Sequence, residues 1–150
     1  MEKILMVCFA GAALGACTPI RHSGAVAEPT GVAGVVAAEA RRQNVPVRLA
    51  LAVAKTESNF NPRARSSAGA VGVMQILPST WRTIGCSGSM TNAADNARCG
   101  VRYLAQGLRE GGERWAVARY HGGPNARAHG RSTHSYASKV LGRARLASRD

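Results

Sequence analysis

Apolar residues recur with the spacing of an amphipathic helix in several segments after residue 30. The clearest pattern covers residues 93–109, where an apolar side chain returns every third or fourth position. Asn92, with Asp95 three residues later, is typical of a capping box at the start of such a helix. Gly111-Gly112 would end it. Weaker helical patterns cover residues 31–44, 46–57, 78–84, 113–120 and a terminal segment that starts near Thr133.

Turn-forming residues separate these patterns. Asn, Pro, Ser and Gly punctuate residues 58–71, which we predict as a loop, and Gly122-Gly123-Pro124 interrupts the chain again before the last helix. No alternation of apolar and polar residues is long enough for a convincing strand. The sequence therefore predicts a mainly α domain over residues 31–148.

Composition leaves this picture in place, but the charge balance is unusual. From a length of 150 residues we expect one modest domain rather than a multidomain receptor or a polytopic membrane protein. Lysine and arginine number 20 against 8 acidic residues, which gives a formal net charge of +12. A basic chain with few large aliphatic residues could be disordered, but the helical periodicity favours a folded domain whose helices pack through alanine.

The first residues have the features of an export signal. Residues 4–16 are all uncharged and apolar or small, a run too short for a membrane span, which needs about 20 residues. Leu14-Gly15-Ala16-Cys17 resembles the lipobox of bacterial lipoproteins, which predicts a signal peptide over residues 1–16, cleavage before Cys17 and acylation of that cysteine. Cleavage after Ala27 and a buried N-terminal helix are the alternatives. Either cleavage exports the chain, so we expect a periplasmic protein, membrane-anchored if Cys17 is acylated, with residues 17–30 as a linker.

Export gives meaning to the two cysteines of the predicted domain. Cys86 and Cys99 lie thirteen residues apart and are the only pair left after the signal and the candidate anchor are set aside. In an oxidising compartment such a pair favours a disulfide. A zinc site is the weaker interpretation, because no second Cys or His lies at ligand spacing beside either cysteine. We therefore predict no metal.

Glu57 is the one carboxylate between Ala40 and Ala94. It continues the apolar stripe of Leu49 and Val53, so it should face the core or a cleft, and it lies at the helix end where the macrodipole is negative. Burial and the dipole both disfavour the charged carboxylate and should raise its pKa. A carboxylic acid that stays protonated near neutral pH can protonate a glycosidic oxygen. The alternative is a helix-end glutamate that reaches solvent or a nearby arginine.

Several motifs follow one another in order along the chain. They are Glu57-Ser58-Asn59-Phe60-Asn61-Pro62, Ser66, residues 69–75, Pro78-Ser79-Thr80-Trp81, Asn96, Gly100, Tyr103-Leu104, residues 118–124, Thr133 and Tyr136. Together they closely resemble the soluble lytic transglycosylase family of peptidoglycan-cleaving enzymes. The resemblance covers about residues 31–145 and implies a lysozyme-like fold of the goose-type lysozyme and lytic transglycosylase type.

The resemblance also implies roles for individual residues. Glu57 matches the catalytic acid of the family, and Ser66 matches a serine that forms hydrogen bonds in the site. Met74 and Gln75 match groove residues that contact the glycan, and an amide such as Gln75 can both donate and accept toward sugar hydroxyls and acetamides. For Met74 the alternative is packing in the core.

Two further residues of the resemblance lie near residue 120. Tyr120 matches an active-site tyrosine that steers the reacting sugar, with a purely structural aromatic as the alternative. His121 stands where the family usually has asparagine; an imidazole can replace one amide hydrogen bond but titrates near pH 6.5, so sugar positioning could respond to acid. Gly69 and Gly72 would let the backbone approach a sugar closely.

The resemblance implies a mechanism with one carboxylate and no metal or organic cofactor. Most glycosidases use two carboxylates, but substrate-assisted enzymes are exceptions, and no second acid is near Glu57 in sequence. Glu57 would protonate the bond between N-acetylmuramic acid (MurNAc) and N-acetylglucosamine (GlcNAc), and the muramoyl acetamide would stabilise the cationic centre. The same carboxylate would then deprotonate the C6 hydroxyl to close a 1,6-anhydro ring.

Other functions stay open at this point. The alternatives are a hydrolytic lysozyme, a non-catalytic peptidoglycan-binding module and, from the charge of +12, a basic protein that binds nucleic acid. The export signal, the scattered arginines and the lack of a recognised binding motif argue against nucleic acid. The expected partner is the glycan strand of peptidoglycan. Small members of the family often serve secretion or pilus assembly complexes, so such a complex is a candidate partner, with general wall turnover as the alternative.

Overall fold

The computed structural model describes residues 28–126 and 130–147. The predicted signal peptide, Cys17 and most of the predicted linker lie outside the described residues. Within them the chain forms five helices, all close to the predicted segments. They are α1 (Gly31–Arg42), α2 (Val47–Ser58), α3 (Pro78–Thr83), α4 (Ala93–Gly122) and α5 (Gly130–Leu146).

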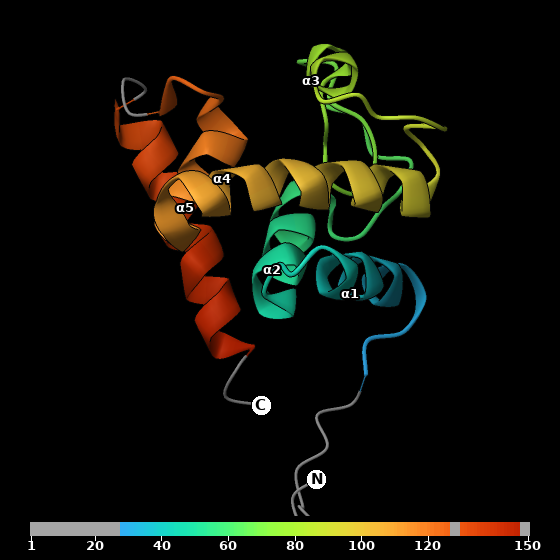
Figure 1. Cartoon of the computed structure of the whole chain (residues 1–150), viewed down its shortest axis with the longest axis horizontal. Helices are drawn as coiled ribbons and strands as arrows, with labels where there is room; N and C mark the ends of the chain where they lie inside the picture. The colour runs from blue at the N-terminus through green and yellow to red at the C-terminus, as the bar shows by residue number, and fades with distance from the viewer. Residues whose placement is uncertain (1–27, 127–129, 148–150) are drawn as a thin grey trace, which may run out of the picture.

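Helix α4 is the centre of the arrangement (Figure 1). It packs against α1 on one side and α5 near its C-terminal end, and α2 packs against α1, α4 and α5. Helix α3 lies on the other side of α4 from α1 and α2. The largest fully buried side chains are Leu49, Met74 and Leu104. Many alanines surround them, among them Ala40, Ala54 and Ala97, which is how a chain with few large aliphatic residues still closes a core.

The apolar stripes predicted from the sequence mostly face this core. Val53 of α2, Val101 of α4 and Val140 of α5 are fully buried, as the periodicity predicted. The apolar pattern predicted over residues 93–109 begins with Ala94, which is exposed because it lies in the first turn, before α4 meets the core. Helix α5 begins at Gly130, slightly before the predicted start near Thr133. No helix in the described residues is long and apolar enough to cross a membrane.

The start of α4 is capped by Asn92. Its side-chain oxygen accepts hydrogen bonds from the backbone N–H groups of Ala94 (3.0 Å) and Asp95 (3.1 Å), as predicted. The second half of the expected capping box differs, because the Asp95 carboxylate accepts from the N–H of Ser89 and pairs with Arg98. These bonds fold the preceding loop back onto the first turn of α4.

Helix α4 is broken where the sequence predicted its end. Gly111 and Gly112 have non-helical backbone angles, and Gly112 has φ of +75°, in the region that favours glycine. The second segment then continues to Gly122 rather than stopping at Tyr120. The break separates the long core-packed part of α4 from the short part that carries Tyr120 and His121.

The loop between α2 and α3 is organised by one buried side chain. Asn96, which is fully buried, donates to the carbonyls of Val71 (3.0 Å) and Met90 (2.9 Å) and accepts from the N–H of Met74 (2.8 Å). Gly72 has φ of +87°, and a Cβ there would lie 2.3 Å from the Asn96 amide nitrogen. Gly72 is therefore needed for contact with Asn96, which corrects the expectation that it serves close approach to a sugar.

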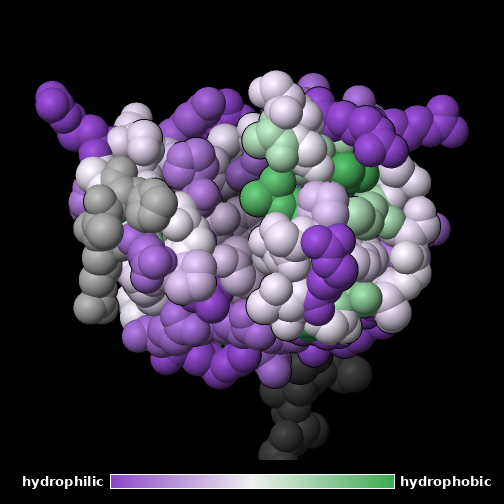
Figure 2. Space-filling model, turned by 90° about the horizontal axis from the view of Figure 1, so that it is seen from above, coloured by the Kyte–Doolittle hydropathy of each residue, from purple (hydrophilic) through white to green (hydrophobic). Residues whose placement is uncertain are grey.

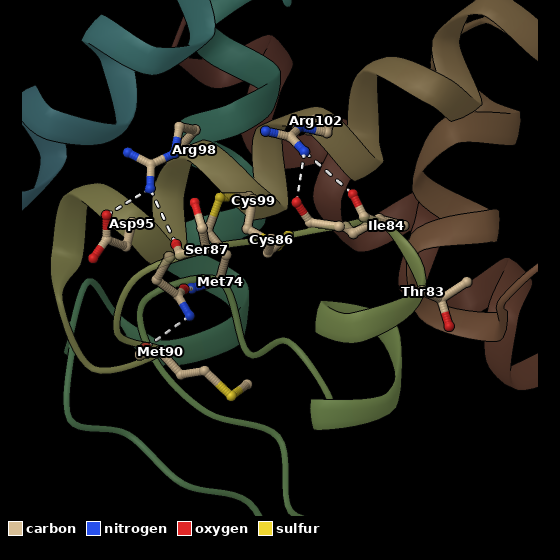
Figure 3. Close-up of a disulfide and its surroundings, with 12 residues drawn as sticks. Met74, Thr83, Ile84, Cys86, Ser87, Met90, Asp95, Arg98, Cys99 and Arg102 are labelled. Atoms are coloured by element: carbon tan, nitrogen blue, oxygen red, sulfur yellow. Dashed lines mark hydrogen bonds and ion pairs between the residues drawn. A yellow bond between two sulfur atoms is a disulfide. The ribbon is translucent and has the colours of Figure 1, made fainter.

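Cys86 and Cys99 form a disulfide with their Cα atoms 5.7 Å apart. It joins the loop after α3 to α4, and Figure 3 shows two arginines of α4 reaching the same loop. Arg98 donates to the carbonyl of Ser87 (3.1 Å), and Arg102 donates to that of Ile84 (3.2 Å). Together these contacts fix α3 above α4.

Candidate active site

A cleft of about 310 Å³ opens where α2, α3, α4 and the long loop meet. Seen from above, the surface is hollowed between a polar side, formed by the end of α4 and α5, and a side around α3 where apolar surface gathers (Figure 2). The apolar side includes Leu77, which is 39% exposed. The cleft is lined by Glu57, Ser66, Ala68, Ala70, Gln75, Ile76, Leu77, Thr80, Tyr103, Tyr120, His121 and Gly123.

Glu57 lies in the last turn of α2 and is partly buried. The chain leaves the helix directly after it, because Asn59 adopts the left-handed conformation (φ 53°) as the C-cap. Burial raises the pKa of Glu57, while a hydrogen bond from Tyr136 and the positive charge of Lys139 oppose that rise. The net direction is upward, as predicted from its place on the apolar stripe. Glu57 can therefore hold its proton at higher pH than an exposed glutamate.

Glu57 differs from the other acids in the part of the chain that the structure describes. Each of the others forms an ion pair with arginine, namely Glu28 with Arg41, Glu39 with Arg42, Asp95 with Arg98, Glu110 with Arg119 and Glu113 with Arg48. Glu57 has no such arginine among the described residues, and none of the other acids lines the cleft. The site thus offers one carboxyl group.

Tyr136 of α5 donates its hydroxyl hydrogen bond to Glu57 Oε1. Burial raises the pKa of Tyr136, and the neighbouring Glu57 carboxylate raises it further, so the phenol stays protonated and acts as a donor. Sequence reasoning included Tyr136 in the family resemblance without assigning it a role. Spacing could not find this contact, because the two residues are 79 positions apart and meet only when α5 packs on α2.

Tyr120 lies in the short second segment of α4 and lines the cleft. Its hydroxyl donates to the carbonyl oxygen of Met74 (2.6 Å), and its ring packs against that of Tyr103 with centroids 5.5 Å apart. Burial raises its pKa well above the ordinary value for tyrosine, with the charge of Glu57 as a further cause. Tyr120 therefore has a structural contact and a face on the cleft at the same time.

Met74 does not line the cleft. Its side chain is completely buried in the core, and its backbone carbonyl accepts a hydrogen bond from the cleft residue Tyr120. The expectation that Met74 contacts a glycan is therefore wrong for its side chain, and the alternative of core packing is correct. The physical reason is that Asn96 holds the Met74 N–H and pulls this part of the loop inward.

Ser66 and Gln75 do line the cleft, as the resemblance implied. The Ser66 hydroxyl oxygen accepts from the N–H of Ala70 (3.0 Å), which leaves its own proton available to a ligand. The Gln75 amide nitrogen donates to the carbonyls of Ala64 (3.1 Å) and Gly72 (2.9 Å). These bonds orient the Gln75 side chain and leave its carbonyl oxygen as an acceptor.

His121 lines the cleft and is exposed. Its ring stacks on that of Tyr136, with centroids 4.4 Å apart and an angle of 13° between the planes. Among the described residues, no group of three or more His, Cys, Asp and Glu side chains is placed to hold a metal ion. The chemistry that this arrangement offers is proton transfer by one carboxyl group, with the hydroxyl groups of Tyr136 and Ser66 and the amide of Gln75 nearby.

Comparisons with known proteins agree on one family. A family model described as the transglycosylase SLT domain matches residues 34–140. A transglycosylase of Enterobacteria phage PRD1 is 38% identical over 110 residues, which are 71% of this chain and 40% of the phage protein. Membrane-bound lytic murein transglycosylase C of Histophilus somni (strain 2336) is 39% identical over 75 residues, 43% of this chain and 21% of that protein.

A solved structure gives the same result for the fold. It is an inactive Glu-to-Gln mutant of the lytic transglycosylase Slt from Pseudomonas aeruginosa, with a TM-score of 0.68 and 25% identity. The match covers 81% of this chain and 24% of the Slt chain. This chain therefore spans less than half the length of each of these three proteins.

Proposed function

Because the chain belongs to the transglycosylase SLT domain family and has its mainly α, lysozyme-like fold, we propose that it is a lytic transglycosylase of peptidoglycan. Its substrate in this proposal is the glycan strand, cleaved at the β-1,4 bond between MurNAc and GlcNAc. The observation that carries the proposal is the single carboxyl group in the cleft, whose pKa is raised by burial and which has no arginine partner among the described residues.

In the first step Glu57 acts as the general acid. Its carboxyl proton passes to the glycosidic oxygen as the bond from that oxygen to C1 of MurNAc breaks, and the GlcNAc product leaves with the proton. The oxygen of the MurNAc acetamide bonds to C1 and takes up the positive charge. The Tyr136 hydrogen bond supports this step because it stabilises the carboxylate that proton transfer leaves behind.

In the second step the Glu57 carboxylate acts as the general base. It removes the proton of the C6 hydroxyl, the C6 oxygen bonds to C1, and the acetamide oxygen leaves. The 1,6-anhydro ring closes without water, and Glu57 regains its proton for the next cycle. One carboxyl group is enough for both steps, in agreement with the cleft, where every other lining residue lacks a carboxylate.

Cleft residues other than Glu57 bind and orient the glycan in this proposal. Ser66 donates its free hydroxyl proton, and Gln75 offers a carbonyl oxygen to sugar N–H or O–H groups. Tyr120 presents a rigid ring face, since its hydroxyl is held by the Met74 carbonyl. Leu77 and Thr80 form the opposite wall, where apolar sugar faces can pack.

The second candidate is a hydrolytic lysozyme, which would place water rather than the C6 hydroxyl on C1. A water attack in most glycosidases needs a second carboxylate as base or nucleophile. The ion pairs of Asp95, Glu110 and Glu113 with arginines, away from the lining of the cleft, favour the transglycosylase.

We also propose that the chain acts outside the cytoplasm, where peptidoglycan lies. The apolar segment 4–16 supports export, and Cys17 is the proposed site of lipid attachment. Service to a secretion or pilus assembly complex, as opposed to general wall turnover, is the proposed biological context.

The test is digestion of purified peptidoglycan by the wild type and by Glu57→Gln. Glutamine keeps the size of the side chain but carries no transferable proton, so the release of soluble fragments should fall at least about 100-fold. Sedimentation with insoluble peptidoglycan should show that binding is retained. Unchanged fragment release by Glu57→Gln would contradict the assignment, whereas binding without release by the wild type would indicate a non-catalytic module.

A further inference from the structure

His121 makes a contact that its place in the sequence did not predict. It lies at the end of α4, is exposed, and covers one face of the Tyr136 ring at 4.4 Å between centroids and nearly parallel planes. Tyr136 lies on α5 and is only partly buried. The stack therefore joins the C-terminal end of α4 to α5, and it adds to the packing of the Tyr136 ring against the core.

The stacked ring is the one that holds Glu57. The Tyr136 hydroxyl donates to Glu57 Oε1. Because the hydroxyl oxygen lies on the axis of the ring, its position depends on the χ1 torsion, which swings the whole ring. Aromatic pairs favour offset-stacked or edge-to-face arrangements, so a ring against one face of Tyr136 limits how far the phenol can swing to that side. An asparagine, which the family pattern predicts at residue 121, has no ring to do this.

We propose that His121 is a positioning residue, which stacks on Tyr136 and so keeps the phenol hydroxyl against Glu57. The inference rests on the proposed function, because it concerns delivery of the Glu57 proton. It assigns His121 to the alignment of the acid rather than to a sugar contact. In this chain a stacked aromatic ring thus occupies the position at which the family usually has asparagine.

The inference has a consequence for pH dependence with a definite sign. The charged and titratable groups that act on Glu57 are Tyr136 and Lys139 of α5 and Tyr120 of α4. The Tyr136 hydrogen bond lowers the pKa of Glu57, so its loss raises that pKa, while Lys139 is unaffected. Because the acid must be protonated to act, a higher pKa moves the pH at which kcat/KM is lost to a higher value.

Two substitutions separate the stack from the polar atoms of the imidazole. His121→Ala removes both, and His121→Phe removes the ring nitrogens but keeps an aromatic ring for Tyr136. We expect His121→Ala to lower kcat about 5- to 10-fold, because a misplaced catalytic group transfers its proton less efficiently. KM should change less than about 2-fold, and the alkaline limb of the pH profile of kcat/KM should shift to higher pH. His121→Phe should restore kcat and the position of the limb.

A double-mutant cycle tests whether His121 acts through Tyr136. If it does, His121→Ala should lower kcat no further in a protein that already carries Tyr136→Phe, since the hydroxyl is gone. The matched control is His134→Ala, which removes an exposed histidine of α5 that does not line the cleft and should leave kcat and KM unchanged. Thermal unfolding of each variant checks that the fold is intact.

Three results would overturn the inference. They are a raised KM with unchanged kcat in His121→Ala, which indicates a sugar contact; equal loss in the Ala and Phe variants; and fully additive effects of His121→Ala and Tyr136→Phe. Glu57→Gln in the same assay keeps this failure separate from failure of the proposed function. If Glu57→Gln is inactive while His121→Ala equals the wild type, only the positioning role is wrong.

Discussion

At the scale of single residues, the site depends on the surroundings of one carboxyl group, which differ from those of the other acids in the described residues. Five acids in the described residues are neutralised by arginine, whereas Glu57 faces a cleft, a phenol hydroxyl and a more distant lysine. An arginine beside Glu57 would hold its pKa low and leave it without a proton to donate. Because arginine is abundant in this chain, the lack of an arginine partner for Glu57 among the described residues is the electrostatic feature that sets it apart.

This arrangement should cost stability at neutral pH, which Glu57→Gln can reveal. The pKa of Glu57 is 4.5 in the unfolded chain and is raised above that value in the folded chain. At a pH between the unfolded-state pKa and the folded-state pKa, the folded chain therefore binds more protons than the unfolded chain. Stability is therefore full below about pH 4 and falls as pH rises through the folded-state pKa. Glutamine mimics the protonated acid, so Glu57→Gln should raise Tm by roughly a few degrees at pH 7 and by nearly nothing at pH 4.

The control for this prediction is Glu113→Gln. Glu113 pairs with Arg48, so its replacement removes an attraction and should not raise Tm at either pH. Thermal unfolding followed by circular dichroism at both pH values is the measurement. A Tm of Glu57→Gln equal to that of the wild type at pH 7 would mean that burial of the carboxylate costs nothing.

Residue-level prediction from the sequence succeeded where chemistry and periodicity coincided. Glu57 could be placed on a buried stripe because Val53 and Leu49 precede it by about one and two helical turns. Met74 could not be placed, since an apolar side chain in a loop gives no period from which to tell the core from a groove. Its burial depends on Asn96, which lies 22 residues away in sequence.

At the scale of elements, α3 forms one wall of the cleft and has few apolar anchors of its own. The helix is six residues long and buries one large side chain, Trp81. Its attachment to α4 includes the Cys86–Cys99 disulfide and the arginines that reach the loop carbonyls (Figure 3). The wall that carries Leu77 and Thr80 is therefore held by covalent and polar contacts as well as by Trp81.

Removal of the disulfide should destabilise the domain measurably. The bond closes a loop with a sequence separation of 13 residues, and loss of such a loop constraint costs about 3 kcal/mol in free energy of unfolding. Urea unfolding of a Cys86→Ala/Cys99→Ala variant should show this loss. Reduced wild type serves as the control and should unfold at nearly the same urea concentration as the variant, because neither has the bond. A variant as stable as the oxidised wild type would contradict this account of α3.

Element boundaries were predictable where backbone chemistry dictates them. Asn92 and Gly111-Gly112 mark the start and the break of α4, because a side-chain cap and a positive φ have strong residue preferences. The path of the loop from Asn59 to Leu77 was not predictable, since it depends on tertiary bonds from Asn96 and Ser58. The sequence motifs of this loop carried the family resemblance without revealing which residues point inward.

At the scale of the whole molecule, the net charge of +12 suits a polymer that bears carboxylates. Five arginines form ion pairs within the described part of the chain, and Arg63 and Arg65 are among those that form none with a described residue. Both line a shallow hollow with Ser89, Thr91 and Asn92. Ser66, the residue that follows Arg65, lines the cleft, so the hollow and the cleft are neighbours along the loop.

We expect this hollow to contribute to substrate attraction. Arg63→Gln/Arg65→Gln should raise KM for peptidoglycan about 3-fold at low salt, and the difference from the wild type should shrink as salt is added, as for charges at the rim of a binding surface. Arg114→Gln, an exposed arginine that does not line the hollow, is the control for loss of charge in general. Equal effects per charge removed would indicate diffuse attraction rather than a local contribution.

The central claim is that Glu57 closes a ring within the sugar instead of activating water, and the mass of the products tests it most directly. Mass spectrometry of the fragments released from purified peptidoglycan should show MurNAc ends lighter by one water than reducing ends, and these fragments should disappear with Glu57→Gln. Release of reducing MurNAc ends by the wild type would contradict the account and identify the chain as a hydrolytic lysozyme.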